Sequence, residues 1–419
     1  MSFLFLLLFI IFTFLRPQEW VPGMIGWPII NIFAVLAFIG LIFERNSSGK
    51  KLFLNVPQNK MVLAFFGAIL MSHVAHTYLW GLREAFFSFL PVLVLFYLTL
   101  NGIDTEKKFR ISFWAIVIVS LILVAQGHYQ INNFYGWAGQ PVTLQNSAEG
   151  EVQRINWIGI FGDPNDLALT FVVAVGFLLP FVFGKCKTLS RLVSIGGVAA
   201  LLYGLILTNS RGGILALLAT GFFFFVRKTR KFVFGSIVGG GMGFLFLLIA
   251  PSRMGELSSS EGSAASRLDL WYEGLQIFKH NLVFGRGYNM FMEALAQTAH
   301  NSYVLAAAEL GTVGLVLWIG LLFIAIKGCW IVQEKNNELA TYALAMQSSI
   351  VGFAAAAFFL SRTYNILPFL LVALSGSLWY VAQQKDQSIR CPVTKKDWRN
   401  ILLISILSIV SVYFFIRAR

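Results

Sequence analysis

Residues 300–326 read HNSYVLAAAELGTVGLVLWIGLLFIAI, and residues 302–326 of this stretch contain a single charged side chain. A helix needs roughly 20 apolar residues to cross about 30 Å of hydrocarbon. The stretch is therefore predicted to form a transmembrane helix that begins directly after a polar pair, His300 and Asn301. The same pair ends a long polar loop, so the sequence places a titratable side chain at a membrane boundary.

The composition of the chain agrees with a membrane protein. Hydrophobic residues make up 57% of the 419 residues and charged residues only 12%, which excludes a soluble globular protein. The formal net charge of +13 would suit nucleic acid, but the basic residues form short clusters between apolar runs, where they orient helices. We therefore expect no nucleic-acid partner, and membrane lipids as the surroundings.

Apolar runs of similar length recur along the whole chain. They do not alternate with polar residues, which excludes a transmembrane barrel. The first run lacks a basic segment before it, so we interpret it as a span and not as a signal peptide. We expect an all-α polytopic integral membrane protein, a single transmembrane domain over 1–419 with about 12–13 helices, at 2–15, 26–43, 61–80, 85–100, 111–129, 166–184, 192–208, 212–226, 232–250, 302–326, 341–360, 365–382 and 400–416.

Lysine and arginine are distributed unequally between the two sides of this predicted bundle. With the N-terminus in the cytoplasm, 21 of the 32 basic residues fall on the cytoplasmic side and 11 on the other side. This bias supports the topology. It also leaves a few external arginines that the positive-inside rule does not explain, among them Arg16, Arg211, Arg267 and Arg286.

Two external loops, 130–165 and 251–301, are long enough to form an active site. In the second, Ser266 is a good helix N-cap and is followed by apolar residues at helical spacing, namely Leu268, Trp271, Leu275 and Phe278. Asp269, Glu273 and Lys279 lie off this stripe. We predict an amphipathic helix on the membrane surface, with Arg267 in its first turn, where N–H groups and the helix dipole favour an anion.

Other residues of these loops have both a structural and a functional interpretation. Arg286, between two glycines, suits a phosphate or an ordinary turn. Arg211 interrupts two apolar runs, where a charge needs a partner or a function, unless it extends to the membrane surface. His300 has the ordinary pKa of a general base but also suits a helix end, and Asn301 either orients it or caps the next helix.

Gly311 and Gly314 are expected to let another helix approach closely. Asp163, Pro164 and Asp166 have the spacing of a helix start. Asp163 and Asp166 also share a face with the arginines, and Arg154 and Arg362 are further candidates for a supporting role. His73 and His76 have no third ligand nearby in the sequence, so we assign no metal site.

The chain resembles the superfamily of bacterial O-antigen ligases and O-antigen polymerases. The ligase signature is His, then Asn, Ser or Gln, nine residues, and Gly-x-x-Gly, and His300, Asn301, Gly311 and Gly314 match it in full. Ser210 to Gly212, the loop helix with Arg267, and Gly-x-Pro-Asn-x-x-Ala from Gly162 to Ala168 are also similar to family features.

The resemblance implies a metal-independent glycosyltransferase without a cofactor, in the bacterial inner membrane, with its active site on the periplasmic side. It implies an undecaprenyl-diphosphate-linked glycan as donor. His300 would be the general base toward an acceptor hydroxyl, and Arg211 and Arg267, with Arg286 as an addition, would bind the diphosphate. Guanidinium groups form bidentate bonds to phosphate oxygens, which agrees with this role.

The resemblance leaves the acceptor open. We expect the lipid A core of lipopolysaccharide, which would make the protein an O-antigen ligase. The alternatives within the superfamily are polymerisation of O-antigen or exopolysaccharide and transfer to Ser or Thr of a protein. A transporter or flippase for lipid-linked saccharides is an alternative of another class. That class predicts charges near the bilayer midplane and internal pseudo-symmetry, neither of which the sequence shows.

Overall fold

The computed structural model describes residues 2–147, 150–184, 186–230, 232–233 and 262–417. Helices occupy twelve of the thirteen predicted spans, and the remaining one, 232–250, lies almost entirely outside the described residues. The helices at these spans are α1 (Ser2–Leu15), α2 (Ile29–Ser47), α3 (Pro57–Val74), α4 (Leu79–Gly102), α5 (Glu106–Asn133), α6 (Pro164–Phe183), α7 (Thr188–Thr208), α8 (Arg211–Thr229), α12 (Ser302–Lys335), α13 (Ala340–Ala356), α14 (Ile366–Lys385) and α15 (Lys395–Arg417).

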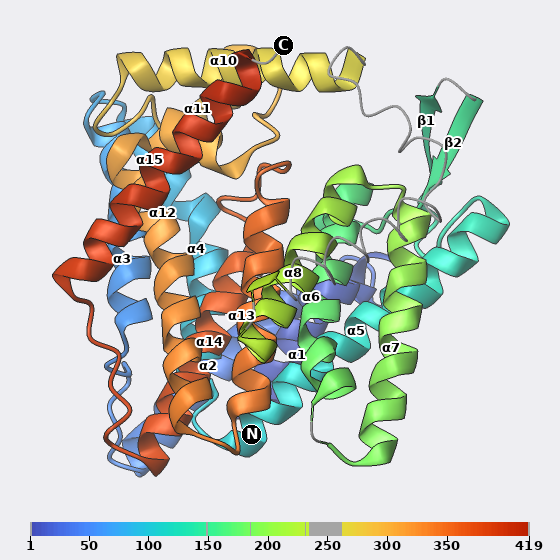
Figure 1. The fold of residues 1–419 in the computed structure, drawn as a ribbon, viewed down its shortest axis with the longest axis vertical. Helices are drawn as coiled ribbons and strands as arrows, with labels where there is room; N and C mark the ends of the chain where they lie inside the picture. The colour runs from blue at the N-terminus through green and yellow to red at the C-terminus, as the bar shows by residue number, and fades with distance from the viewer. Residues whose placement is uncertain (1, 148–149, 185, 231, 234–261, 418–419) are drawn as a thin grey trace.

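Within the described residues, nine of these helices are long and apolar enough to cross a bilayer, and α1 and α13 are shorter apolar helices. The prediction of an all-α polytopic membrane protein is confirmed. Its centre is formed by α6 and α14, because 89% and 83% of their apolar segments are buried, whereas the figure is 17% for α2 and α15. One of the two poorly buried helices, α15, runs along the outside of the bundle (Figure 1).

The contact between α6 and α13 shows how the centre packs. A Cβ built on Gly176 would lie 2.8 Å from the Cα of Ser349, so only glycine permits this approach. The Ser349 hydroxyl donates to the Val173 carbonyl at 2.8 Å. Small residues and hydrogen-bonded hydroxyls are the usual means by which membrane helices pack closely.

The two chain ends lie at opposite ends of the bundle, and α10 (Gly262–His280) crosses the end at which α15 finishes (Figure 1). We call this the α10 end. A two-stranded hairpin, β1 (Thr143–Ser147) with β2 (Gly150–Arg154), lies at the same end (Figure 1). The sequence did not predict it. The short elements are η1 (Pro17–Glu19), η2 (Gly159–Phe161) and α11 (Met290–Leu295).

The amphipathic loop helix is present as α10, with Trp271 buried and Asp269, Glu273 and Lys279 exposed, as the apolar stripe predicted. Trp271 packs edge-on against Phe358 and Phe415, which fixes α10 to the bundle. The predicted start at Ser266 was wrong, since the helix begins at Gly262. The preceding residues Ser263, Ala264 and Ala265 include two alanines, the strongest helix former. Arg267 is therefore in the second turn, and the argument from the helix N-terminus does not apply to it.

The helix α12 is broken at Gly311, whose φ of 66° and ψ of −163° are not helical. Residues 282–287 lie along this break. The N–H groups of Thr312 and Val313 donate to Leu282 and Val283, and those of Arg286 and Gly287 donate to the freed carbonyls of Ala308 and Glu309. The glycine was expected to admit another helix, and the structure instead places an irregular loop there, which satisfies the backbone groups that the break exposes.

Candidate active site

His300 lies between the polar loop and α12, in a left-handed backbone turn with φ 49°. Its imidazole is half-buried. The next residue, Asn301, is fully buried and caps α12, because its Oδ1 accepts from the N–H groups of Tyr303 at 2.9 Å and Val304 at 3.1 Å. Of the two predicted roles for Asn301, the structure shows the cap. The cap fixes the point from which the imidazole projects.

The start of α12 is also bound to the segment 357–365, which joins α13 to α14. Ser302 donates its N–H to Ala357 at 2.8 Å and its hydroxyl to Leu360 at 2.5 Å. The Ser302 hydroxyl also accepts from the Arg362 N–H at 2.8 Å. Arg362 is thereby bonded to a residue only two positions after His300, although Arg362 itself is 62 positions away from His300 in the sequence.

The Arg362 side chain reaches α6. Its Nε and Nη2 donate to the two carboxylate oxygens of Asp166, an ion pair in which the Asp166 side chain is only 6% exposed. A bidentate pair fixes the plane of the guanidinium as well as its position. Asp166 and Arg362, both predicted as supporting residues, are thus brought together by the fold.

The N-terminus of α6 connects several of the candidate site residues through hydrogen bonds. Asp163 is its N-cap, as predicted, and its Oδ1 accepts from both the backbone and the side-chain nitrogen of Asn165 at 2.8 Å. The Asn165 Oδ1 in turn accepts from the Ser210 hydroxyl at 2.7 Å and from Arg154 Nη2 at 3.0 Å. Asn165 was missing from the predicted site, although the Gly-x-Pro-Asn pattern contains it.

The predicted residue Arg154 has a structural position. It is buried, and its Nε and Nη1 donate to the carbonyl of Thr208 at 2.8 Å and to Oε1 of Gln145 at 2.7 Å. Together with its bond to Asn165, this joins β2, α7 and α6. We infer that Arg154 holds the site together and does not bind a ligand directly.

Arg211 is the first residue of α8, directly after Ser210, which caps that helix through the Gly213 N–H at 3.1 Å. Beside it lies a small cleft that is lined in part by Arg267 of α10. The other residues that line it come from the starts of α6 and α8 and from the segment after α13; they include Asn165, Ser210, Gly212 and Phe359. The cleft therefore places Arg267 against the helix start that carries Arg211.

The charges around His300 act on its protonation. Burial lowers its pKa from the ordinary value, the positive charges of Arg267 and Arg362 lower it further, and the carboxylate of Asp163 opposes them. The net direction is down, so the imidazole is biased toward the neutral form, which accepts a proton. Arg267, Arg362 and Asp163 are therefore the charged groups that act on the protonation of His300.

Arg286 does not join this group. Its backbone N–H is bonded to Ala308 of α12, while its side chain is exposed, and among the described residues no hydrogen bond or ion pair links that side chain to His300. The same loop contacts the turn after α3, where His76 Nε2 forms a 2.7 Å hydrogen bond with the Gly285 carbonyl. Among the described residues, no three His, Cys, Asp or Glu side chains are grouped as metal ligands.

Breaking the ion pair between α6 and the segment after α13 is predicted to destabilise the protein. Asp166→Asn leaves the Arg362 guanidinium without its carboxylate in a mostly buried position, which costs about 3 kcal/mol of unfolding free energy. We expect a lower melting temperature in detergent and a parallel loss of activity. Glu273→Gln, a matched change at an exposed position of α10, is the control. Equal melting temperatures for the two variants would contradict the prediction.

Comparison with known protein families bears on the same region. Residues 196–319 match the family model described as O-antigen ligase. The matched region runs from within α7 into α12 and includes Arg211, Arg267, His300 and Gly311. No curated protein matches the chain. The match confirms the resemblance to the O-antigen ligase and polymerase superfamily that the His300 to Gly314 signature indicated.

Proposed function

We propose that this chain, which matches the O-antigen ligase family model over residues 196–319, transfers a glycan from an undecaprenyl-diphosphate-linked donor to a hydroxyl group at the α10 end of the bundle. The observation that carries the proposal is the cleft in which Arg267 of α10 meets the starts of α6 and α8, together with the hydrogen bond that holds Arg362 at the start of α12 beside His300. A base next to guanidinium groups suits a reaction in which a hydroxyl must lose a proton and a diphosphate must leave.

In the proposed reaction, the neutral His300 imidazole accepts the proton of the acceptor hydroxyl. The hydroxyl oxygen forms a bond to the anomeric carbon of the donor sugar. The bond from that carbon to the diphosphate oxygen breaks, and its electron pair stays on the diphosphate. Arg267 and Arg211 stabilise this growing negative charge, which removes the need for a metal ion.

The remaining residues act through these three. Asn301 fixes the backbone beside His300, and Asp163, Asp166, Arg362 and Arg154 fix the helix starts around the cleft. Arg286 is included as a peripheral cation for the donor, because its backbone is held on α12 while its side chain stays exposed. Asp163 has a second effect, since its charge favours the protonated imidazole that forms during the reaction.

For the acceptor we propose the lipid A core, on the periplasmic side of the inner membrane, so that the protein acts as an O-antigen ligase. The complete match of His300 to Gly314 to the ligase signature favours this over the polymerase. Transfer to the donor lipid itself, or to a protein hydroxyl, is the alternative that the same base and cations would support.

The test is glycan transfer by the purified, chelator-treated protein, with undecaprenyl-diphosphate oligosaccharide and lipid A core. We predict that Arg267→Ala lowers kcat by about 10²- to 10³-fold, as for loss of one group that stabilises transition-state charge. Lys279→Ala, at an exposed position on the same helix, is expected to leave kcat unchanged.

The products distinguish the alternatives. Elongation of the donor without transfer to the core would identify a polymerase, and glycosylation of a peptide would identify a protein transferase. Translocation of the donor across vesicles without any transfer would overturn the proposal in favour of a transporter. Equal rates for Arg267→Ala and Lys279→Ala would remove Arg267 from the site.

A further inference from the structure

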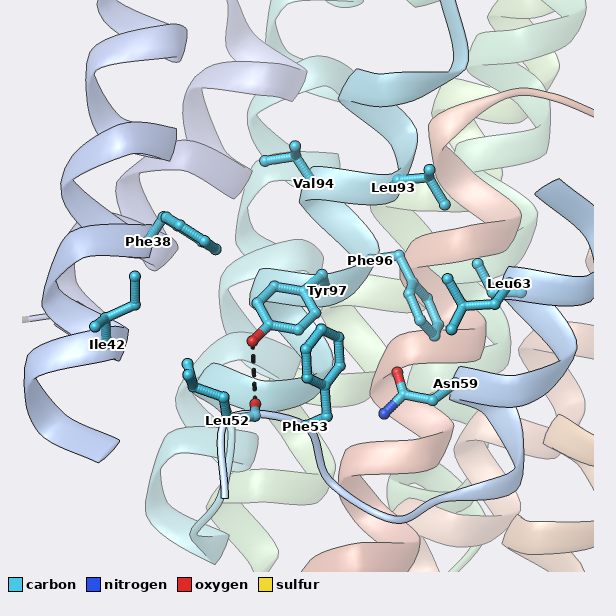
Figure 2. A pocket seen from close by; sticks show the side chains of 11 residues that line it. Phe38, Ile42, Leu52, Phe53, Asn59, Leu63, Leu93, Val94, Phe96 and Tyr97 are labelled. Atoms are coloured by element: carbon cyan, nitrogen blue, oxygen red, sulfur yellow. Dashed lines mark hydrogen bonds between the residues drawn. The ribbon is translucent and has the colours of Figure 1, made fainter. Parts of the chain in front are cut away.

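Two apolar cavities adjoin each other between α2 and α4. The first has a volume of ≈ 340 Å³ and is lined by α2, the loop after it, α3 and α4, with Phe53, Leu63 and Tyr97 among its residues (Figure 2). The second, of ≈ 500 Å³, lies between α1, α2 and α4. Phe38 and Val94 line both. We call the two adjoining cavities together the α2–α4 groove.

The lining of this groove suits an apolar chain. Three of its polar side chains are already bonded within the protein: the Tyr97 hydroxyl donates to Leu52 at 3.1 Å (Figure 2), Asn59 Nδ2 to Leu54 at 2.6 Å, and the Thr13 hydroxyl to Phe9 at 2.7 Å. A polar ligand would lose its hydrogen bonds to water here without gaining new partners. A hydrocarbon chain forms no such hydrogen bonds and has none to lose.

The groove leads to the candidate active site. Its outer cavity includes Ile160, three positions before Asp163, and Ile366, four positions after Arg362. Arg16 lies at this end too, packed directly on Gly159, and its Nε and Nη2 donate to the carboxylate of Glu19, with which it forms an ion pair. The groove thus ends near the Asp163 loop, beside the Arg16–Glu19 ion pair, and most of the side chains along its length are apolar.

The groove is also placed for entry from the membrane. The helix α2 is mostly exposed, with Val35, Phe38 and Ile39 more than a third accessible, and it packs mainly against α1 and α4. A substrate dissolved in the bilayer can reach a groove beside such a helix without passing through water.

We propose that the α2–α4 groove holds the polyisoprenoid chain of the lipid-linked donor, with its diphosphate end toward Arg16 and the Asp163 loop. This inference rests on the proposed function, because it assigns the lipid part of the same substrate. The groove would fix where along the membrane normal the diphosphate lies relative to His300.

The first experiment compares donors of two chain lengths. Val94→Trp fills the middle of the groove, and Val193→Trp, on the exposed surface of α7, is the matched control. With the undecaprenyl donor, we expect Val94→Trp to raise KM about tenfold, within the range for a changed methylene-sized contact in an apolar pocket. With a geranyl donor, whose chain is about a fifth as long as undecaprenyl and fills less of the groove, we expect a smaller change in Val94→Trp and no change in Val193→Trp.

The second experiment does not depend on transfer. Undecaprenyl diphosphate that carries a photoreactive group in its chain is expected to label α2 and α4 in wild type and Val193→Trp, and to label them weakly in Val94→Trp. Labelling of α2 and α4 with no transfer by the wild type would contradict the proposed function but support the groove as the site of the polyisoprenoid chain. Equal labelling in both variants, or the same KM change with both donors, would contradict the groove proposal. The groove would then be occupied by ordinary phospholipid.

Discussion

Replacing His300 by alanine is expected to lower kcat for glycan transfer by about 10²- to 10⁴-fold, the usual contribution of a positioned general base. The imidazole is held by a left-handed turn and by the capped start of α12, so no neighbouring side chain on the same segment can replace it. His280→Ala, an exposed histidine at the end of α10, is the matched control and is expected to retain full activity.

The pH dependence of kcat/KM gives His300 a second signature. Burial and the positive charges of Arg267 and Arg362 lower its pKa, so the base becomes neutral, and activity rises, at a pH below the ordinary histidine value of about 6.5. Removing one positive charge with Arg267→Gln raises that pKa. The acid limb of the residual activity should therefore move to higher pH in this variant, and Lys279→Gln should leave it in place.

Three results would count against His300 as the base. The first is an acid limb that is the same in wild type and His300→Ala, which would assign that limb to another group. The second is a shift of the limb to lower pH in Arg267→Gln, because loss of a cation cannot lower the pKa of a neighbouring imidazole. The third is full transfer activity in a folded His300→Ala variant, which would leave only a structural role for the residue.

The helices of this protein could be predicted from its sequence because apolar runs of membrane length are a local property. The run before Arg45 and the run after Asp163 each give a helix within a few residues of the predicted limits. The Asp163 cap was predicted for the same reason, since a cap and its helix are adjacent in the chain. The shared side of His300 and Arg267 followed from counting spans and basic residues.

The pairing of these elements could not be predicted, because it joins residues that are far apart in the chain. Asp166 and Arg362 are 196 positions apart, and nothing in either segment indicates the partner. The roles of Asn165 and Ser210 depend on the approach of α6 to α8. The hairpin β1–β2 escaped prediction because its residues are polar and lack the alternation of a half-buried strand. The α2–α4 groove depends on spacing between helices.

The signature glycine Gly311 was predicted to be important for close packing of another helix. The structure shows a different reason, because α12 is broken at this residue. As a packing glycine in a regular helix, it would tolerate alanine whenever the neighbouring helix can shift slightly. As the residue at a break, it has a backbone conformation that is essentially restricted to glycine. The two interpretations predict different results for one substitution.

Gly311→Ala is expected to destabilise the protein strongly. The backbone conformation costs alanine on the order of 1–3 kcal/mol. In addition, the new Cβ would lie 2.4 Å from the carbonyl carbon and oxygen of Val283 and 2.6 Å from the nitrogen of Gly285. These are backbone atoms, which cannot rotate away, so the loop must leave the break in α12. We expect a large fall in the melting temperature and loss of transfer, because the same half of α12 begins beside His300.

Gly328→Ala provides the control on the same helix. Its added Cβ would meet only ordinary contacts, 3.5 Å from Gln58 and 3.9 Å from Trp379, and alanine is favoured over glycine in a helix by about 1 kcal/mol. Its melting temperature should equal or exceed that of the wild type. If Gly311→Ala melted like Gly328→Ala, α12 would have to be continuous through residue 311, and the hydrogen bonds from Arg286 and Gly287 to Ala308 and Glu309 could not exist.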